Sequence, residues 1–144
     1  MDFKDGRESL GELDQAILQE LGDDINENVL DHVLRPRNAG VMEDPDGEAF
    51  LTGICEDAVR IQIRLSGDRI GDIRFMTNGC GATVACASVA TDLARGKTSR
   101  EVLRISTVHI LEALGGLPVE YTHCADLTAN TLRAAVRDAL GTHW

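Results

Sequence analysis

The chain has 144 residues, 43% of them hydrophobic, and a formal net charge of −10. That length fits a single domain with a core of its own, while the apolar runs are too short for a transmembrane helix. The acidic charge argues against a nucleic-acid surface, because affinity for phosphates depends on clustered Lys and Arg. We therefore expect neither membrane nor nucleic acid among its partners.

The N-terminal segment carries most of this charge. Residues 1–27 hold nine acids and two bases, a balance of −7, which leaves −3 for the other 117 residues. Apolar residues at helical spacing predict a short helix over residues 9–21, where Ser9 and Glu12 can form a capping box. We predict two parts: residues 1–25 as an acidic N-terminal extension with this short helix, and residues 26–142 as the main domain.

The next segments predict one more helix and then a sheet. A helix is expected over residues 27–35, ended by Pro36 and a turn over 35–40, and a loop over 42–48 leads into a first strand at 49–53. Over residues 59–65, apolar and polar residues alternate, which predicts a strand with one buried and one wet face. The wet face would hold Arg60, Gln62 and Arg64. A short Gly-containing turn at 66–68 joins this strand to another over 69–77.

The second half of the chain is predicted to be helical. Small residues form a helix over 82–95 that ends at Gly96, and two short helices follow over 99–105 and 106–114. A last helix is expected over 125–140, with its inward face made by Leu127, Leu132, Ala135, Val136 and Leu140. Strands followed by helices predict an α+β fold, in which helices cover one face of a small antiparallel sheet of about three strands.

Three of the four cysteines lie in turns that carry glycine or acidic residues. Cys55 lies in G-I-C-E-D, Cys80 in N-G-C-G-A and Cys124 in T-H-C-A-D, and the separations of 25 and 44 residues are too long for a local zinc knuckle. Asp57 follows the first cysteine by two residues, and His123 directly precedes the third. Thiolate, imidazole and carboxylate are the usual ligands of zinc and iron. If the fold brings these residues together, they form a soft-metal or iron–sulfur site.

We expect Cys80 at a helix N-terminus and Cys124 immediately before the last helix. Oriented N–H groups at such positions favour thiolates. No basic segment followed by an apolar stretch stands near the start of the sequence, so we expect reduced thiols and a cytoplasmic protein.

Residues from about 26 to 140 resemble the U-type iron–sulfur cluster assembly scaffolds, the family of IscU and the N-terminal domain of NifU, in the SufE/NifU superfamily. The matching segments are V-L-D-H at 29–32, R-P-R-N-A-G at 35–40, C-E-D at 55–57, N-G-C-G-A at 78–82, G-K-T at 96–98, and L-P at 117–118 ahead of H-C at 123–124. They follow the family's order and span about four-fifths of the chain.

This resemblance implies a non-enzymatic scaffold and sulfur acceptor. Such a protein takes sulfur from a cysteine desulfurase (IscS/NifS-like), binds iron, builds a transient [2Fe–2S] cluster and transfers it to apo iron–sulfur client proteins. By position, Cys55, Cys80 and Cys124 would be cluster ligands and candidate sulfur acceptors. Asp57 would be the fourth, labile ligand and His123 an alternative one. The same donors also suit tetrahedral Zn²⁺, which we expect as a possible occupant of the purified protein.

An alternative function is that of a zinc-dependent persulfide sulfurtransferase of the SufU type. The 44 residues between the second and third cysteines lack the longer insertion of that branch, which favours the scaffold. A zinc deaminase is disfavoured, because H-I-L-E at 109–112 lacks the H-x-E spacing and the chain has no P-C-x-x-C.

The sequence departs from the family in two places. Glu56 follows Cys55 where the family usually has glycine, which puts a bulky anion beside the site. The L-P-P-V-K segment that docks an Hsp70-type chaperone reads L-P-V-E-Y at 117–121, so we predict little or no such docking.

The fourth cysteine and the histidines can also be interpreted as structural or surface residues. Cys86, inside the small-residue helix, is predicted to be a buried core residue, and its functional alternative is a spare thiol that captures persulfide or supplies a fourth ligand. His123 fits a hydrogen-bonding neighbour as well as a ligand. His32 and His109 lie at helical positions and are expected to be ordinary structural or surface residues.

Overall fold

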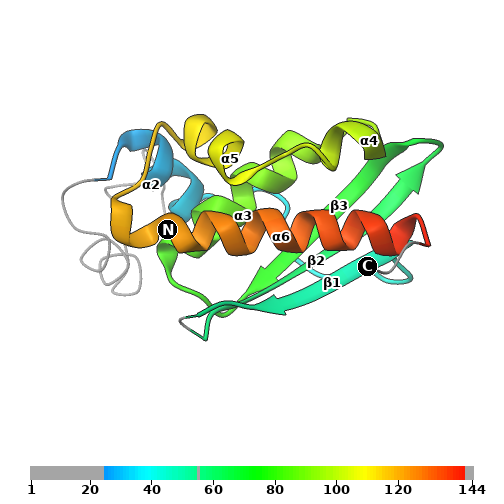
Figure 1. Cartoon of the computed structure of the whole chain (residues 1–144), viewed down its shortest axis with the longest axis horizontal. Helices are drawn as coiled ribbons and strands as arrows, with labels where there is room; N and C mark the ends of the chain where they lie inside the picture. The colour runs from blue at the N-terminus through cyan, green and yellow to red at the C-terminus, as the bar shows by residue number, and fades with distance from the viewer. Residues whose placement is uncertain (1–24, 55, 142–144) are drawn as a thin grey trace, which may run out of the picture.

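The structure is a computed structural model that describes residues 25–54 and 56–141 (Figure 1). The helix expected over residues 9–21 lies outside the described residues. In chain order the elements are α2 (Glu27–Leu34), β1 (Gly47–Thr52), β2 (Ala58–Ser66), β3 (Arg69–Thr77), α3 (Gly81–Ala94), α4 (Ser99–Val102), α5 (Thr107–Leu114), the 3₁₀ helix η1 (Val119–Tyr121) and α6 (Thr122–Ala139).

The three strands form one antiparallel sheet in the order β1–β2–β3. In Figure 1, α6 runs across one face of the sheet with α3 beside it, and α6 packs on β1 and β2 while α3 packs on β3. Ile61, Ile63 and Ile73 point into this interface and are fully buried. The apolar face of the alternating pattern thus becomes the core, and the expected α+β fold with a three-stranded antiparallel sheet is confirmed.

Helix α3 lies at the centre of the helical layer. It contacts α2, α5, α6 and β3, and eleven of its fourteen residues are buried. Most of these are Ala, Gly, Ser or Thr, whose small side chains let neighbouring backbones approach closely. Close packing against these neighbouring elements therefore fixes the position of α3 and of its N-terminus.

The wet face of β2 is partly covered, which corrects the expectation for Gln62. This side chain is only 3% exposed, because the backbone of Met42 lies over it. The Met42 N–H donates to Gln62 Oε1 at 2.8 Å, and Gln62 Nε2 donates to the Met42 carbonyl at 3.1 Å. The same segment is tied to β3, where the Gly40 N–H donates to the Phe75 carbonyl at 2.9 Å. The segment around Met42, which lies outside the sheet, thus buries Gln62, although the alternating sequence pattern alone predicts that Gln62 faces solvent.

The first strand begins two residues earlier than expected, at Gly47 rather than Ala49, and ends at Thr52. A Cβ atom at Gly47 would lie 2.3 Å from the Ala139 backbone nitrogen, so glycine permits the close contact between β1 and the end of α6. Leu140, expected to face inward, is 48% exposed because it follows the last residue of α6 at the edge of this contact.

The last helix begins three residues earlier than expected. The 3₁₀ turn η1 follows Pro118 and runs directly into α6 at Thr122. His123 and Cys124 therefore lie in the first turn of α6, and the expectation that Cys124 precedes the helix is wrong. The helix expected over 99–105 is also shorter, since α4 ends at Val102, while the second short helix is α5.

Within the described residues, the helices are too short or too polar to cross a bilayer.

Candidate metal centre

Three segments that are distant in sequence meet at one end of the sheet, on the left in Figure 1. They are the loop between β1 and β2, the connection from β3 to α3, and the first turn of α6. The first loop is closed by the Gly53 N–H, which donates to the Asp57 carbonyl at 2.8 Å, and by the Glu56 N–H, which donates to the Gly53 carbonyl at 3.1 Å. Cys55 lies outside the described residues, so its expected role as a ligand stays a prediction.

The N-G-C-G segment is fixed to the start of β2 by its own polar residues. Asn78 Oδ1 accepts the Ala58 N–H at 2.8 Å, and the Thr77 hydroxyl donates to the Ala58 carbonyl at 2.6 Å. The Gly79 N–H in turn donates to Thr77 Oγ1 at 2.9 Å. Because Ala58 directly follows Asp57, these bonds hold the segment that carries Cys80 close to the predicted carboxylate ligand.

Donor atoms of three expected ligands come together. One ligand atom each from Asp57, His123 and Cys124 lie within 4.8 Å of one another, and the Cys124 sulfur is 3.6 Å from His123 Nε2. In a tetrahedral site with metal–ligand distances of about 2.0–2.3 Å, neighbouring donors are about 3.3–3.8 Å apart. The observed spread is close to that range, so a small closure would let these three residues bind one metal ion. Their chemistry, a thiolate, an imidazole and a carboxylate, fits zinc or iron.

Cys80 is joined to this group through Thr83, whose hydroxyl lies 3.7 Å from the Cys80 sulfur and 3.4 Å from the Cys124 sulfur. Cys80 is the N-cap residue of α3, and its side chain makes no capping hydrogen bond. A hydrogen bond from the Cys124 thiol is the main cause that lowers the pKa of Cys80, to about 5, and the helix N–H groups add to it. The same bond raises the pKa of Cys124, which is nearly fully buried. Both directions favour the thiolate on Cys80, the cysteine at the helix N-terminus, over one on Cys124.

Thr83 is a residue of the centre that the sequence analysis did not identify. Its hydroxyl donates to Asp57 Oδ2 at 3.0 Å and lies 3.4 Å from the Cys124 sulfur and 3.7 Å from the Cys80 sulfur. The side chain is fully buried. One signal could have pointed to it: it follows Cys80 by three residues, so a helix that starts at this cysteine places both on one face.

The other cysteine and histidines have structural positions. Cys86 is fully buried in the core, as predicted, and its burial raises the pKa of the thiol. His32 is 6% exposed and its Nδ1 lies 2.7 Å from the Ser88 hydroxyl, while His109 Nδ1 accepts the Ser106 N–H at the start of α5. None of these three residues belongs to the group of Asp57, His123 and Cys124.

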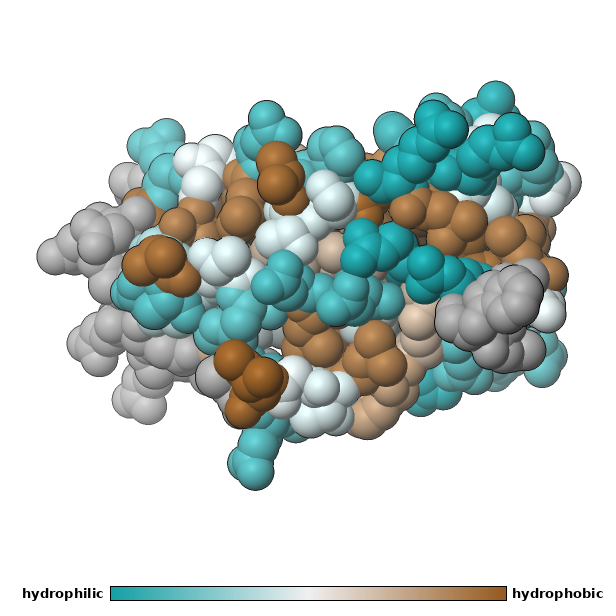
Figure 2. All heavy atoms as spheres, viewed as in Figure 1, coloured by the Kyte–Doolittle hydropathy of each residue, from teal (hydrophilic) through white to brown (hydrophobic). Residues whose placement is uncertain are grey.

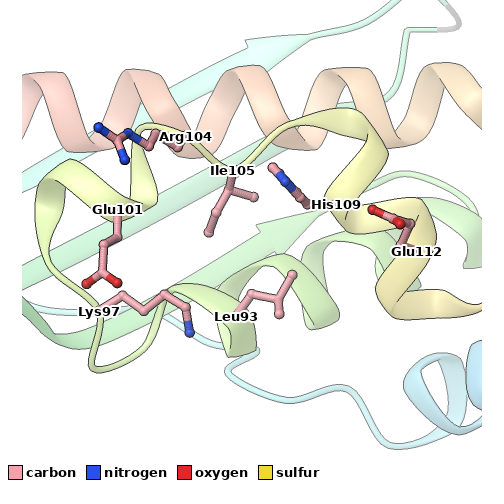
Figure 3. A pocket seen from close by; sticks show the side chains of 7 residues that line it. All are labelled: Leu93, Lys97, Glu101, Arg104, Ile105, His109 and Glu112. Carbon is pink, nitrogen blue, oxygen red and sulfur yellow. The ribbon is translucent and has the colours of Figure 1, made fainter.

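A cavity of about 440 Å³ lies elsewhere, between the end of α3, α4 and α5 (Figure 3). Leu93 and Ile105 supply its apolar lining, and its rim mixes both signs of charge on Lys97, Glu101, Arg104, His109 and Glu112. It contains no predicted site residue, and its mixed rim selects no ligand by charge.

Exposed apolar side chains flank the centre in sequence. Ile54 is 87% and Val119 84% exposed, the two highest values among the large hydrophobic residues that the structure describes. Figure 2 shows single brown side chains protruding among white and teal ones on this side of the molecule. One of the two residues precedes Cys55, and the other begins η1, which leads to His123.

An α+β fold that gathers cysteine, carboxylate and imidazole donors at one end of its sheet defines a class of metal- or cluster-binding domains. A family model described as "NifU-like N terminal domain" matches residues 24–143. The chain therefore belongs to the NifU-like N-terminal domain family.

Individual relatives agree with this assignment. "Iron-sulfur cluster assembly scaffold protein IscU 1" of Archaeoglobus fulgidus is 44% identical over 114 residues, which are 78% of this chain and 74% of the relative. "Iron-sulfur cluster assembly scaffold protein IscU" of Azotobacter vinelandii is 37% identical over 118 residues, 78% of this chain and 91% of the relative. Among solved structures, the N-terminal NifU-like protein from Brucella abortus has a TM-score of 0.65 at 18% identity, over 81% of this chain and 94% of that one, which shows the shared fold.

Proposed function

We propose that this protein is a scaffold on which iron–sulfur clusters are assembled and from which they are transferred to client proteins. In this role it is a carrier without catalytic turnover: iron and sulfide are its cargo. The cluster would be of the [2Fe–2S] type, held by Cys55, Cys80, Cys124 and Asp57, with His123 as an alternative donor. Membership of a family whose members include named IscU scaffolds supports this role.

The observation that carries the proposal is the convergence of unlike donors at one place. One ligand atom each from Asp57, His123 and Cys124 lie within 4.8 Å of one another, and the Thr83 hydroxyl lies 3.4 Å from the Cys124 sulfur and 3.7 Å from the Cys80 sulfur. Stable clusters are usually held by four thiolates. A carboxylate is a harder ligand that exchanges more readily with an incoming thiolate. A mixed set of donors therefore suits a site that both assembles and releases its cargo.

Sulfur delivery needs a thiol that a partner can reach. Among the described cysteines, Cys80 is half-buried, whereas Cys86 and Cys124 are buried. Cys80 is therefore the acceptor we propose among them. Its thiolate would attack the terminal sulfur of a persulfide on a cysteine desulfurase. The new S–S bond forms on Cys80 as the donor's S–S bond breaks, and the donor cysteine leaves as a thiolate.

The proposed partners are the desulfurase and apo client proteins. Ile54 and Val119, exposed on segments that lead to the site, offer apolar contacts to a docked protein. The change from L-P-P-V-K to L-P-V-E-Y supports the prediction that an Hsp70-type chaperone docks weakly or not at all. A cytoplasmic location likewise stays a prediction.

The test is anaerobic reconstitution with iron and sulfide, followed by visible absorption and by iron and sulfide analysis. Wild type should gain the absorption of a [2Fe–2S] cluster with two irons per cluster. Serine substitution of Cys55, Cys80 or Cys124 should sharply reduce the yield, whereas Cys86→Ser should retain it. Loss of the cluster in Cys86→Ser alone would refute the ligand assignment, and no cluster in wild type would refute the function.

The alternative, a zinc-dependent sulfurtransferase, is not better supported by the named relatives. It predicts that tightly bound Zn²⁺ persists during persulfide transfer and that iron does not replace it. Zinc analysis before and after reconstitution separates the two functions.

A further inference from the structure

We propose that the Thr83 hydroxyl positions Asp57 for metal binding, by a hydrogen bond to one carboxylate oxygen that leaves the other oxygen available as a ligand. Thr83 is then a positioning residue rather than a ligand. The inference rests on the proposed function, since it concerns the same centre.

The hydroxyl is fixed in place before any metal binds. Thr83 is the third residue of α3, and its side chain is fully buried, so water does not compete for its proton. Its Oγ1 donates to Asp57 Oδ2 at 3.0 Å, which joins the first turn of α3 to the loop between β1 and β2. This bond holds the carboxylate against the first turn of α3.

The same hydroxyl touches three expected ligands. Besides Asp57, it lies 3.4 Å from the Cys124 sulfur and 3.7 Å from the Cys80 sulfur. These oxygen–sulfur distances are close to the spacing between neighbouring ligands of one metal ion, so the hydroxyl lies beside the expected metal position. A neutral hydroxyl is also a poor ligand for soft metals beside thiolates. Thr83 therefore lies next to the metal position and contacts the ligands themselves.

A hydroxyl has one proton, so it donates to one acceptor at a time. The carboxylate takes it, because an ionised oxygen accepts a shorter and stronger hydrogen bond than sulfur does. With Oδ2 held by Thr83, Oδ1 stays free to face the metal. Loss of a hydrogen-bond partner of this kind typically weakens metal binding about 10- to 100-fold. Because Asp57 is one of several ligands, we expect the lower end, about tenfold.

The experiment is a Zn²⁺ titration of the metal-free protein against a competing chelator. Thr83→Val replaces the hydroxyl by a methyl group of similar size and should weaken Zn²⁺ binding about tenfold, whereas Thr83→Ser keeps the hydroxyl and should bind as wild type does. The matched control is Thr131→Val. Thr131 is also fully buried, but its hydroxyl donates only to the Leu127 carbonyl of its own helix, at 2.7 Å. This control should leave Zn²⁺ affinity unchanged.

A double-mutant cycle tests the route of the effect. In an Asp57→Ala background, Thr83→Val should cause no further loss, because the group that it positions is gone. A full tenfold loss in that background would refute the proposal and show that the hydroxyl acts on a cysteine. If Thr83→Val does not fold by circular dichroism, the comparison is made between Thr83→Ala and Thr83→Ser, with the same expected difference.

The outcomes separate the two proposals. Wild type that binds no Zn²⁺ and forms no cluster would refute the metal centre as a whole. Wild type that binds, with Thr83→Val equally tight, would refute only the role of Thr83.

Discussion

Gly79→Ala tests whether the first turn of α3 is packed against the cysteine segment as tightly as the structure shows. A Cβ atom at Gly79 would lie 2.8 Å from Thr83 Cβ and Oγ1 and 2.9 Å from its Cγ2. Ordinary contact begins at 3.4 Å, so the two segments must separate by about 0.6 Å, which is 3.4 minus 2.8. Thr83 is fully buried, so other protein atoms surround its side chain.

Such overpacking costs about 1–3 kcal/mol, and we expect about 2 kcal/mol of lost unfolding free energy, measured by urea denaturation of the metal-free protein. The shift also moves the Thr83 hydroxyl away from Asp57, so Zn²⁺ affinity should fall as well. Because the backbone at Gly79 does not have a positive φ, conformational strain adds nothing.

The control for this prediction removes the Thr83 side chain, which the new Cβ atom would contact. Thr83→Gly deletes all three contacted atoms, and in that background Gly79→Ala should cost less than about 0.5 kcal/mol, because coupled residues do not act additively. An unchanged unfolding free energy in Gly79→Ala alone, or an equal loss in both backgrounds, would refute the packing argument.

Four further predictions address the centre and its surroundings. Asp57→Ala should still form a cluster but transfer it to an apo-ferredoxin more slowly, because the exchangeable ligand is gone; equal or faster transfer from a folded variant would contradict this. A peptide spanning residues 116–123 should give little or no stimulation of an Hsp70-type ATPase, and strong stimulation would show that its Leu-Pro core suffices. Burial lowers the pKa of His32 below its usual 6.5, so the unfolded state binds more protons at this residue than the folded state does. The stability contributed by the neutral ring is lost as the pH falls below about 6.5, and the slope of unfolding free energy against pH in that range should be smaller in His32→Gln; an equal slope in both proteins would contradict this. Glu56 has a φ of 65°, a backbone conformation that costs a non-glycine residue about 1–2 kcal/mol. Glycine removes this strain, but it also gives the unfolded chain more conformational entropy, which offsets part of the gain. Glu56→Gly should therefore raise the unfolding free energy by about 0.5 kcal/mol, and a loss of stability would contradict the strain.

The elements that sequence analysis predicted well are those whose signal is local. The alternation at 59–65 became β2, because a strand that packs one face on helices needs apolar residues at every second position. The small-residue stretch after Cys80 became α3, and Cys86 is buried within it. The family resemblance, carried by short motifs in order, is confirmed by the match over residues 24–143.

Other features depend on contacts between segments far apart in the chain, which no local pattern records. Gln62 is buried because Met42 folds over it, and β1 starts at Gly47 because the end of α6 approaches that backbone closely. Cys124 lies within α6 rather than before it, because η1 runs directly into the helix.

The candidate metal centre likewise combines features that are local in the sequence with features that depend on contacts between distant segments. The amino-acid sequence by itself determined which donors are available, since cysteine, aspartate and histidine in turns are recognisable by residue type. Only the tertiary structure decided that Asp57 and Cys124, 67 positions apart, both lie within 3.4 Å of the Thr83 hydroxyl. The physical reason is that donor identity is a property of single residues, whereas donor geometry depends on how α3 and α6 pack against the sheet.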